Sequence, residues 1–472
     1  MTRPALLVAA TVAALGATAL AAQPRAAIDS AALAALLDSV VPAAMRAERQ
    51  PGAVVAVVAG GRVVLARGWG VADLETRRPM SAESTIVRIG SISKVLTAVA
   101  VAQLADRGAI DLRADVNRYL KRLQAPDAFG KSLTAWHLLT HTAALDEIRP
   151  GTQAERESEL QPLDRFLRGK LVPVMPPGEV TSYSTYGITL AGLLVEDVSG
   201  LPFEEYLRRN VWGPLGMRRT SIAVPRADAA LVAVPYDVTE GRPVRAPWEW
   251  YHTTPASSVN ATALDMARFM VANLAGGGGI LSPRMTAEMQ RQQATVHPRV
   301  PGFGLGWQLA TTNGERVVEH GGDVAGFSSM LTLLPDRGVG IFVAGHREGS
   351  DLRFAVRNAV LDRFFPDRRP REPVTSMHHT RADAARSARR FAGRYRASIF
   401  CHTCASPRPM PEVDVVANDD GTLTIWDARW VEVSPAFFRT SDGQRRVGFR
   451  VDPSGRATHL GVGSWQVMER VR

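Results

Sequence analysis

A serine and a lysine lie three residues apart in the segment 90–94, whose sequence is Gly-Ser-Ile-Ser-Lys. The apolar run that follows predicts a helix from Ile92 to Leu104, and this spacing places the side chains of Ser91 and Lys94 on one helix face. A serine hydroxyl is a weak nucleophile until a neighbouring group accepts its proton, and a lysine can do so when burial lowers its pKa. The pair therefore predicts acyl transfer, with Ser91 as nucleophile and Lys94 as base.

Two further observations favour this chemistry. Backbone N–H groups at a helix start have no partner within the helix, so the amide of Ser91 can help to stabilise an oxyanion. Lysine is also rare in this chain, at 4 of 56 basic residues. Because arginine cannot be deprotonated in a protein and lysine can, a lysine at this position favours a base over a solvated surface charge.

The elements that must position this pair are predicted from hydrophobic patterning. A helix is predicted over residues 31–48, and apolar runs at 53–58 and 63–66 flank a Gly-Gly turn, which is typical of a hairpin. A second hairpin is predicted from Met330–Leu334 and Val339–Ala344, while the region between the hairpins is mostly helical to about Leu274. Strands at both ends of a helical region predict one sheet covered by a helical insertion.

The C-terminal part of the chain differs from the rest. Residues 366–388 are rich in Arg and Pro and predict an exposed linker, whereas residues 389–472 alternate apolar and polar positions and predict a small antiparallel β domain. This domain could bind a ligand or a partner, or cover the mouth of an active site. It contains Cys401 and Cys404, for which a local disulfide or a free pair is favoured over a metal site, because zinc needs about four ligands and only His402 is near.

The N-terminus predicts export. Arg3 is followed by an apolar run over residues 5–20 that ends in Ala-Leu-Ala, so residues 1–21 are predicted to be a signal peptide cleaved near Ala21, giving a periplasmic or secreted protein. The run is short for a membrane anchor, and no later segment is apolar enough to predict a membrane span.

Composition excludes several other classes. The 472 residues are 46% hydrophobic and 22% charged, which is typical of a globular protein and excludes a disordered chain. The net charge of +10 comes from arginines scattered among acidic residues, so no nucleic-acid partner is predicted.

Three motifs in order resemble those of the serine β-lactamase and penicillin-binding protein superfamily, in its class C-like branch of esterases, D-amino peptidases and β-lactamases. The first is the Ser-x-x-Lys segment. The second is Tyr183-Ser184-Thr185 after Pro177-Gly178, which resembles the Y-x-N element, and the third is His320-Gly321-Gly322, which resembles the H-x-G strand. The segment 136–142 resembles H-L-L-T-H-T as well.

The resemblance implies roles for residues at the matching positions. Ser91 would be acylated and Lys94 would take its proton. Tyr183, with a pKa lowered by the neighbouring ammonium, would relay protons to the leaving group and from the deacylating water. His320 would line the opposite wall. Gly321 and Gly322 would let the strand backbone approach the acyl group, and the N–H of Asp323 would be the second oxyanion donor.

Other residues near these motifs have structural interpretations. Tyr186 is predicted to lie in the core, and His320 could instead satisfy the end of a strand. His137 and His141 stand four apart, as metal ligands can, but Leu138 occupies the place where a zinc hydrolase needs Glu. We therefore interpret both histidines as structural, with His141 near the site, and predict no metal.

One position departs from the family pattern, because Thr185 stands where Y-x-N has Asn. A hydroxyl is shorter than a carboxamide and lacks its N–H₂ group, so recognition of an acylamino side chain should weaken. This favours ester or D-amino peptidase activity over efficient β-lactam hydrolysis. A catalytically silent scaffold that binds penicillin or a partner is the alternative.

The resemblance implies an α+β fold for residues 31–365, with an antiparallel sheet flanked by helices and an all-helical subdomain. The predicted function is a serine hydrolase whose substrate is a small ester, peptide or lactam. No cofactor is required, because the protein supplies the nucleophile, the base and the oxyanion donors.

Overall fold

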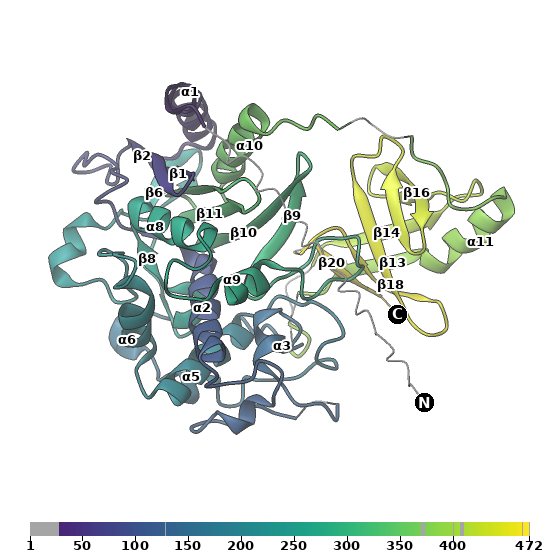
Figure 1. Ribbon diagram of the computed structural model, residues 1–472, viewed down its shortest axis with the longest axis horizontal. Helices are drawn as coiled ribbons and strands as arrows, with labels where there is room; N and C mark the ends of the chain where they lie inside the picture. Colours follow the sequence, from purple (N-terminus) through teal and green to yellow (C-terminus); the bar gives the residue numbers. More distant parts are fainter. Residues whose placement is uncertain are drawn as a thin grey trace, which may run out of the picture.

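The computed structural model describes residues 28–127, 129–369, 373–399, 401–405, 410–464 and 466–471 (Figure 1). The predicted signal peptide, residues 1–21, lies outside the described residues. Two units follow each other along the chain, a large unit built on a sheet with helices and a C-terminal barrel, which Figure 1 shows in yellow.

A six-stranded antiparallel sheet organises the large unit, in the order β2-β1-β12-β11-β10-β9. Strand β1 pairs with β12, so the sheet joins the start of the domain to its end. This confirms both predicted hairpins and the α+β fold. The strands are β1 (Gly52–Ala59), β2 (Arg62–Gly70), β9 (Gln308–Thr312), β10 (Glu315–Val324), β11 (Phe327–Leu334) and β12 (Val339–His346).

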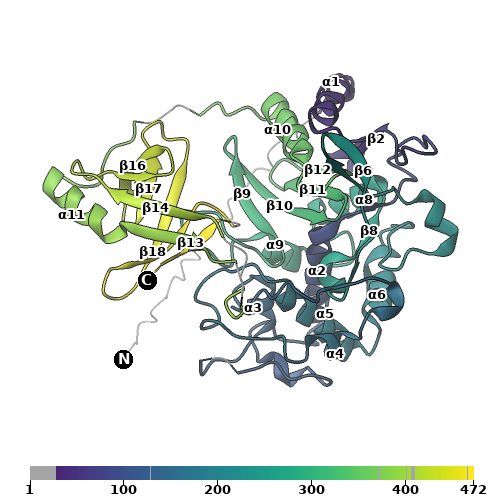
Figure 2. The same cartoon turned by 180° about the vertical axis from the view of Figure 1, so that it is seen from behind.

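Helices cover both faces of this sheet, which explains why every residue of β1 is buried. Alternate side chains enter two cores: Val54, Ala56 and Val58 face one, while Ala53, Val55 and Val57 face the other. Helices α1 (Ser30–Glu48) and α10 (Leu352–Phe364) lie side by side over the second core, as Figures 1 and 2 show, and α8 (Ala263–Leu274) packs on the opposite face.

Helix α1 is long and apolar enough to cross a membrane by length and composition alone. In this fold its buried residues Leu33, Leu37 and Val41 recur at helical spacing and pack in the core beneath it. The packing is therefore that of an amphipathic helix covering a sheet.

The helical subdomain lies between the two halves of the sheet in sequence and surrounds α2 (Ser93–Asp106). Residues Ser93 to Leu104 of α2 are all buried, so this helix has no solvent face. The other helices are α3 (Ala135–Leu139), α4 (Leu163–Leu167), α5 (Thr185–Ser199), α6 (Phe203–Leu207), α7 (Thr254–Ser257) and α9 (Pro283–Gln290). Short strand pairs complete it: β3 (Val87–Arg88) with β8 (Asn260–Ala261), β4 (Gln153–Ala154) with β7 (Trp250–Tyr251), and β5 (Tyr236–Thr239) with β6 (Arg242–Arg245).

The C-terminal unit is a closed antiparallel barrel, in agreement with the predicted β domain. Its core contains Phe391, Tyr395, Trp430, Phe438 and Phe449. The strands are β13 (Gly393–Ala397), β14 (Glu412–Ala417), β15 (Leu423–Ile425), β16 (Ala428–Ser434), β17 (Phe437–Thr440), β18 (Arg446–Val451), β19 (Ala457–Gly461) and β20 (Val467–Arg470).

The predicted linker is shorter than expected, because its last residues belong to helix α11 (Arg381–Phe391). The side chain of Thr380 caps this helix by accepting from the N–H of Asp383, and its buried positions include Ala384, Ala388 and Phe391. Those residues recur at i, i+4 and i+7, so the arginines between them form the solvent face of an amphipathic helix.

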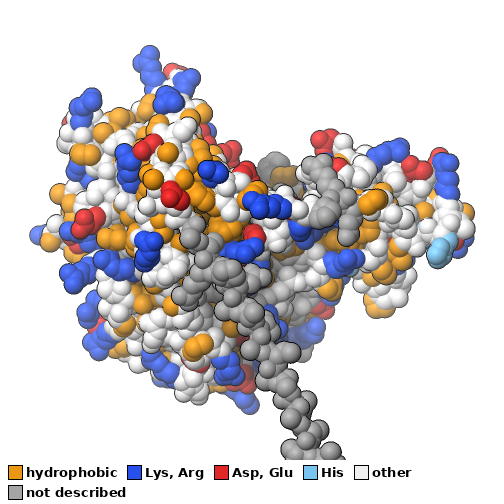
Figure 3. Space-filling view, turned by 45° about the horizontal axis from the view of Figure 1, so that its top comes forward, with side chains coloured by type: hydrophobic (Ala, Val, Ile, Leu, Met, Phe, Trp, Pro, Cys, Tyr) orange, Lys and Arg blue, Asp and Glu red, His pale blue; other side chains and the backbone are white. Residues whose placement is uncertain are grey.

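The barrel forms a second lobe beside the large unit, and charges of both signs are scattered over the face in Figure 3. One contact between the lobes comes from the loop before β9, where the ring of His297 stacks on Phe437 with 5.4 Å between ring centroids. Arg299 Nη1 also donates to Ser434 Oγ over 2.8 Å. A second contact reaches the candidate active site and is described below.

Candidate active site

Ser91 lies in a single helical turn, residues Gly90–Ile92, that leads directly into α2. Lys94 Nζ is 3.0 Å from Ser91 Oγ and donates to the carbonyl oxygen of Ala256 over 2.9 Å. The side chain of Lys94 is almost completely enclosed, with the residue 1% exposed. The structure thus brings the predicted nucleophile and base into direct contact.

The turn that holds Ser91 is fixed by its neighbours. Gly90 has a φ of +52°, and a Cβ there would lie 2.8 Å from the backbone nitrogen of Asp323, so a side chain is excluded on both counts. Ser93 Oγ donates to the carbonyl of Gly90 over 2.6 Å and accepts from the N–H of Val259 over 3.0 Å. Ser329 Oγ of β11 donates to the carbonyl of Ile89 over 2.9 Å. These bonds hold the turn against the sheet.

Burial lowers the pKa of Lys94 to about 7. Desolvation of the ammonium is the largest cause, and the nearby charge of Glu147 opposes it. A substantial fraction of Lys94 is therefore neutral near pH 7, which is the state that can accept a proton from Ser91.

Tyr183 lies where the resemblance implies, and its buried hydroxyl shares a hydrogen bond with Ser91. Lys94 Nζ is 4.9 Å from the centre of its ring. The predicted direction of its pKa shift is wrong, because burial raises the pKa of Tyr183 well above its ordinary value. Desolvation of the phenolate outweighs the hydrogen bond with Ser91, and the charges of Glu147 and Asp323 act in the same direction as desolvation, so Tyr183 remains a neutral phenol.

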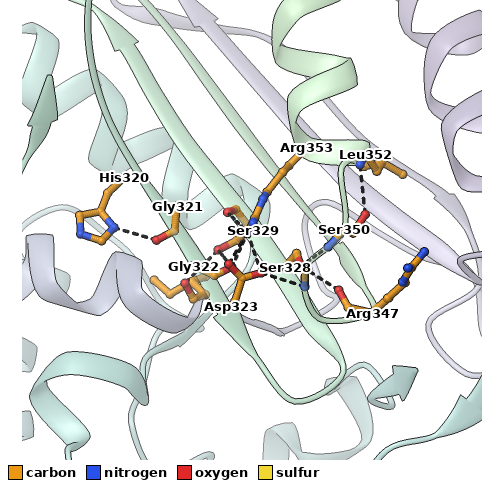
Figure 4. Close-up of polar contacts among 12 residues, drawn as sticks. His320, Gly321, Gly322, Asp323, Ser328, Ser329, Arg347, Ser350, Leu352 and Arg353 are labelled. Atoms are coloured by element: carbon orange, nitrogen blue, oxygen red, sulfur yellow. Dashed lines mark hydrogen bonds and ion pairs between the residues drawn. The ribbon is translucent and has the colours of Figure 1, made fainter. Parts of the chain in front are cut away.

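His320 and the two glycines lie on β10, as Figure 4 shows. His320 Nδ1 is 2.7 Å from the carbonyl oxygen of Gly321, and its ring centre is 6.1 Å from that of Tyr183. Burial lowers the pKa of His320 to about 3, so the imidazole is neutral at ordinary pH. Gly321 borders the cavity, whereas a Cβ on Gly322 would meet the carbonyl oxygen of Ile89 at 2.0 Å. Gly322 therefore allows β10 to approach the Ser91 turn.

Asp323 continues this wall. Its backbone nitrogen lies next to Gly90, so the residue that the resemblance implies as second oxyanion donor is close to the Ser91 turn. Its carboxylate is bound by both terminal nitrogens of Arg353, over 2.8 and 2.9 Å (Figure 4). Arg353 Nη1 also donates to the carbonyl of Gly322 over 2.9 Å. The arginine thus fixes the strand segment that contains Asp323.

Thr185, which replaces the family Asn, holds a carboxylate. Its N–H donates to Glu147 Oε2 over 2.8 Å, and its hydroxyl also hydrogen-bonds the Glu147 carboxylate. Glu147 is 8% exposed, borders the cavity, and has a pKa raised by burial. The sequence places Glu147 at the start of a pocket-lining loop, residues 147–159, but it gives this residue no role, because its partner Thr185 is 38 positions away. The two consecutive acidic residues after the apolar segment 143–145, Asp146 and Glu147, were the available signal.

The other residues singled out in the sequence lie around this centre. Tyr186 is in the core, stacked on Phe166, which confirms its predicted packing role. His137 caps α3 through Thr134. His141 lies against Tyr183, with 4.4 Å between ring centroids, and accepts from the N–H of Ser184. Each histidine thus has structural contacts.

The barrel contributes to the same region. Asp146 Oδ1 accepts from the N–H of His402, and Asp146 Oδ2 accepts from the N–H and the hydroxyl of Thr403. Cys401 and Cys404, which flank these residues, form a disulfide. Ile399 of the same loop borders the cavity. The barrel loop is therefore part of one wall of the site.

These residues surround one cavity of about 630 Å³ between the sheet and the helical subdomain. Ser91, Lys94, Tyr183, Thr185, Gly321 and Asp323 all border it. A partly exposed serine in contact with a buried lysine in such a cleft, beneath an antiparallel sheet, is typical of a serine hydrolase of the β-lactamase and penicillin-binding protein superfamily.

Comparison with known proteins places the chain within that superfamily. The Beta-lactamase family matches residues 37–363, more than two thirds of the 472 residues, so the chain belongs to the β-lactamase family. Esterase EstB of Burkholderia gladioli is 30% identical over 322 residues, which are 60% of this chain and 81% of EstB.

Two other similar proteins extend the comparison. Protein flp of Staphylococcus aureus (strain MRSA252) is 24% identical over 311 residues, 65% of this chain, and the chain spans only 62% of its length. The octameric penicillin-binding protein homologue from Pyrococcus abyssi has a TM-score of 0.63 at 21% identity, covering 93% of this chain and all of that one. This likeness shows a shared fold that includes most of the C-terminal region.

Proposed function

We propose that the protein is an exported serine hydrolase that cleaves an ester or amide bond through an acyl-enzyme on Ser91. The observation that supports this most strongly is the 3.0 Å contact between Ser91 Oγ and the buried Lys94 Nζ. The pKa of about 7 makes Lys94 an effective base at neutral pH. Export rests on the apolar run at residues 5–20.

Acylation begins when the substrate carbonyl enters the cavity above Ser91. Lys94 accepts the hydroxyl proton as Ser91 Oγ bonds to the carbonyl carbon, and the resulting oxyanion receives hydrogen bonds from the N–H groups of Ser91 and Asp323. Tyr183 is a neutral phenol that is hydrogen-bonded to Ser91. It donates its proton to the leaving oxygen or nitrogen and is reprotonated by the Lys94 ammonium. The scissile bond breaks and the first product leaves.

Deacylation uses the same groups in the reverse direction. A water molecule attacks the acyl carbon, and its proton passes through Tyr183 to neutral Lys94. The tetrahedral intermediate collapses with release of the acid, and Ser91 recovers its proton. His320, neutral throughout, shapes the wall beside Tyr183.

Ester or amide hydrolysis of the esterase or D-amino peptidase type is favoured over efficient β-lactamase activity. Thr185 donates both its N–H and its hydroxyl hydrogen to Glu147, so neither donor is available to the carbonyl of an acylamino side chain. The neutral His320 also supplies no cation for a substrate carboxylate, a group that penicillins and cephalosporins carry. The similarity to EstB, an esterase, agrees with this preference.

The experiment is hydrolysis of p-nitrophenyl butanoate, a D-alanyl p-nitroanilide and a chromogenic cephalosporin by the mature chain, with Ser91→Ala and Ser257→Ala. Ser257 borders the same cavity and hydrogen-bonds Thr253, so it is a matched control. We expect turnover of the ester, a loss of at least ~10³-fold in Ser91→Ala, and retained activity in Ser257→Ala. A wild-type chain that turns over none of the three substrates would support the scaffold alternative instead.

A further inference from the structure

The cavity is lined by more acidic than basic side chains, and these acids differ in how their charge is compensated. Asp323 is paired with Arg353 at 2.8 Å, and Glu319 with Arg357 at 3.0 Å. The other three have no lysine or arginine within ion-pair distance among the described residues. These three are Glu147, Glu249 and Glu348. The remaining cations on the wall are Lys94 and the exposed Arg149.

Glu147 is the most enclosed of the three uncompensated acids, at 8% exposed, whereas Glu348 is exposed. The Glu249 carboxylate accepts a hydrogen bond from the hydroxyl of Tyr251. Burying a carboxylate without a paired cation is costly, and the N–H and hydroxyl of Thr185 offset part of that cost for Glu147, together with the more distant charges of Lys94 and Arg149. Burial accordingly raises the pKa of Glu147. Glu147 is thus a buried acid that borders the cavity and has no paired cation among the described residues.

Lys94 cannot supply that counter-charge during catalysis. It is close enough for its charge and that of Glu147 to influence each other, but it forms no ion pair with Glu147. Lys94 must be neutral to accept the proton of Ser91. In the state that is ready to react, the exposed Arg149 is the positive charge that remains near Glu147, and it forms no ion pair with the carboxylate, so a cation on the substrate would supply a direct partner.

We propose that Glu147 determines substrate specificity by binding a protonated amine on the substrate, through its carboxylate, in the cavity that contains Ser91. The proposal deepens the proposed function and rests on it. Thr185 is then a positioning residue, which holds the carboxylate in the cavity wall. A bound ammonium also disfavours protonation of Lys94, so the cationic substrate helps to keep the base neutral.

Three matched p-nitrophenyl esters test this proposal: the β-alanyl ester, its neutral isostere the butanoyl ester, and the anionic hydrogen succinyl ester. Spontaneous hydrolysis is subtracted at each pH. A hydrogen bond to a charged partner predicts that the wild type prefers β-alanyl over butanoyl by at least ~10-fold in kcat/KM, with the succinyl ester poorest.

Glu147→Gln keeps the size of the side chain and removes its charge. Because the readout is the ratio of two substrates in one variant, it cancels any general effect on the base. We expect the β-alanyl preference to fall to within ~3-fold of unity in Glu147→Gln. Glu348→Gln, which removes a charge from the exposed edge of the same cavity, should keep the preference. Thr185→Val, which removes the hydroxyl that holds Glu147, should reduce the preference partly.

The outcomes separate the two proposals. If all esters turn over through Ser91 but the wild type prefers butanoyl, or Glu147→Gln keeps the β-alanyl preference, the ammonium proposal is overturned and the hydrolase stands. If Glu147→Gln does not fold, the wild-type ratio and Thr185→Val decide the question. If no ester turns over and Ser91 is not acylated, both proposals fail together.

Discussion

The two walls of the active-site cavity handle charge in opposite ways. On the β10 wall, both acids are paired with arginines that project from α10, Asp323 with Arg353 and Glu319 with Arg357. On the facing wall, Glu147 is enclosed, accepts hydrogen bonds from Thr185 and has no ion-pair partner among the described residues. Charge on the first wall thus holds the strand that contains Asp323, the proposed oxyanion donor, whereas we propose that charge on the second wall binds a ligand.

The walls also differ in how they are built. The β10 wall belongs to the central sheet and packs so closely on the Ser91 turn that Gly90 and Gly322 leave no room for side chains. The facing wall is made of loops, and it is completed by the barrel loop that Asp146 binds. The β10 wall is thus packed rigidly against the turn that holds Ser91, whereas the loop-built wall can vary and is the wall that we propose determines specificity.

The largest effect is expected at Lys94, which lies between the walls. The arginine in Lys94→Arg keeps a positive charge but cannot lose its proton near neutral pH. The rate of acylation should therefore fall by ~10²–10⁴-fold. Single-turnover release of p-nitrophenol from the butanoyl ester measures this step. Retention of activity within tenfold would mean that another group deprotonates Ser91.

The pH dependence distinguishes the base from the neighbouring imidazole. Because Lys94 is active only when deprotonated, kcat/KM should rise with pH through the pKa of about 7. His320, with a pKa of about 3, stays neutral over this range, so His320→Gln should leave that rise in place. The profile of kcat/KM from pH 5 to 9, in wild type and variant, checks this. A rise that disappears in His320→Gln would assign the titration to the histidine.

A pair of variants contrasts the walls by stability. Arg353→Met removes the cation from Asp323, which is partly exposed and keeps hydrogen bonds from Ser328 and Gly349, and it removes donors from the carbonyls of Gly322 and Ser329, so the free energy of unfolding should fall by about 1–3 kcal/mol. Glu147→Gln removes an uncompensated buried charge and should leave that free energy unchanged or raise it by up to about 1 kcal/mol. Urea unfolding at pH 7 compares them. Equal destabilisation would show that the walls do not differ.

The smallest effect is expected at the barrel loop. Asp146→Ala removes three hydrogen bonds to His402 and Thr403, which should raise KM a few-fold for bulky esters with little change in kcat. Arg299→Ala, which loosens the other contact between the lobes at Ser434, is the matched control and should leave KM unchanged. If both variants change KM equally, the barrel acts through general packing of the lobes.

How much the sequence predicts depends on the separation of the residues involved. Ser91 and Lys94 were predictable because one helical turn holds both, and the two hairpins because each is a local pattern. The contacts of Glu147 with Thr185 and of Asp146 with the barrel were not, because they join residues 38 and more than 250 positions apart. Such contacts depend on the assembled fold.

Two further differences arose from burial. The sequence places a phenol near an ammonium, but it does not reveal that Tyr183 is buried deeply enough for desolvation to raise its pKa. It shows many arginines after residue 380, and their density concealed the apolar stripe of α11. In both cases the sequence shows which residue types are present, but it does not show how far each of them is buried from solvent.

The central claim is that Ser91 becomes covalently modified because Lys94 activates it. It is tested most directly by the intact mass of the mature chain after brief exposure to an aryl phosphonate ester, followed by peptide mapping, in the wild type, Ser91→Ala and Ser257→Ala. We predict one phosphonyl adduct on Ser91 in the wild type and in Ser257→Ala, and none in Ser91→Ala. An unmodified wild-type chain, or an adduct that persists in Ser91→Ala, would contradict the account.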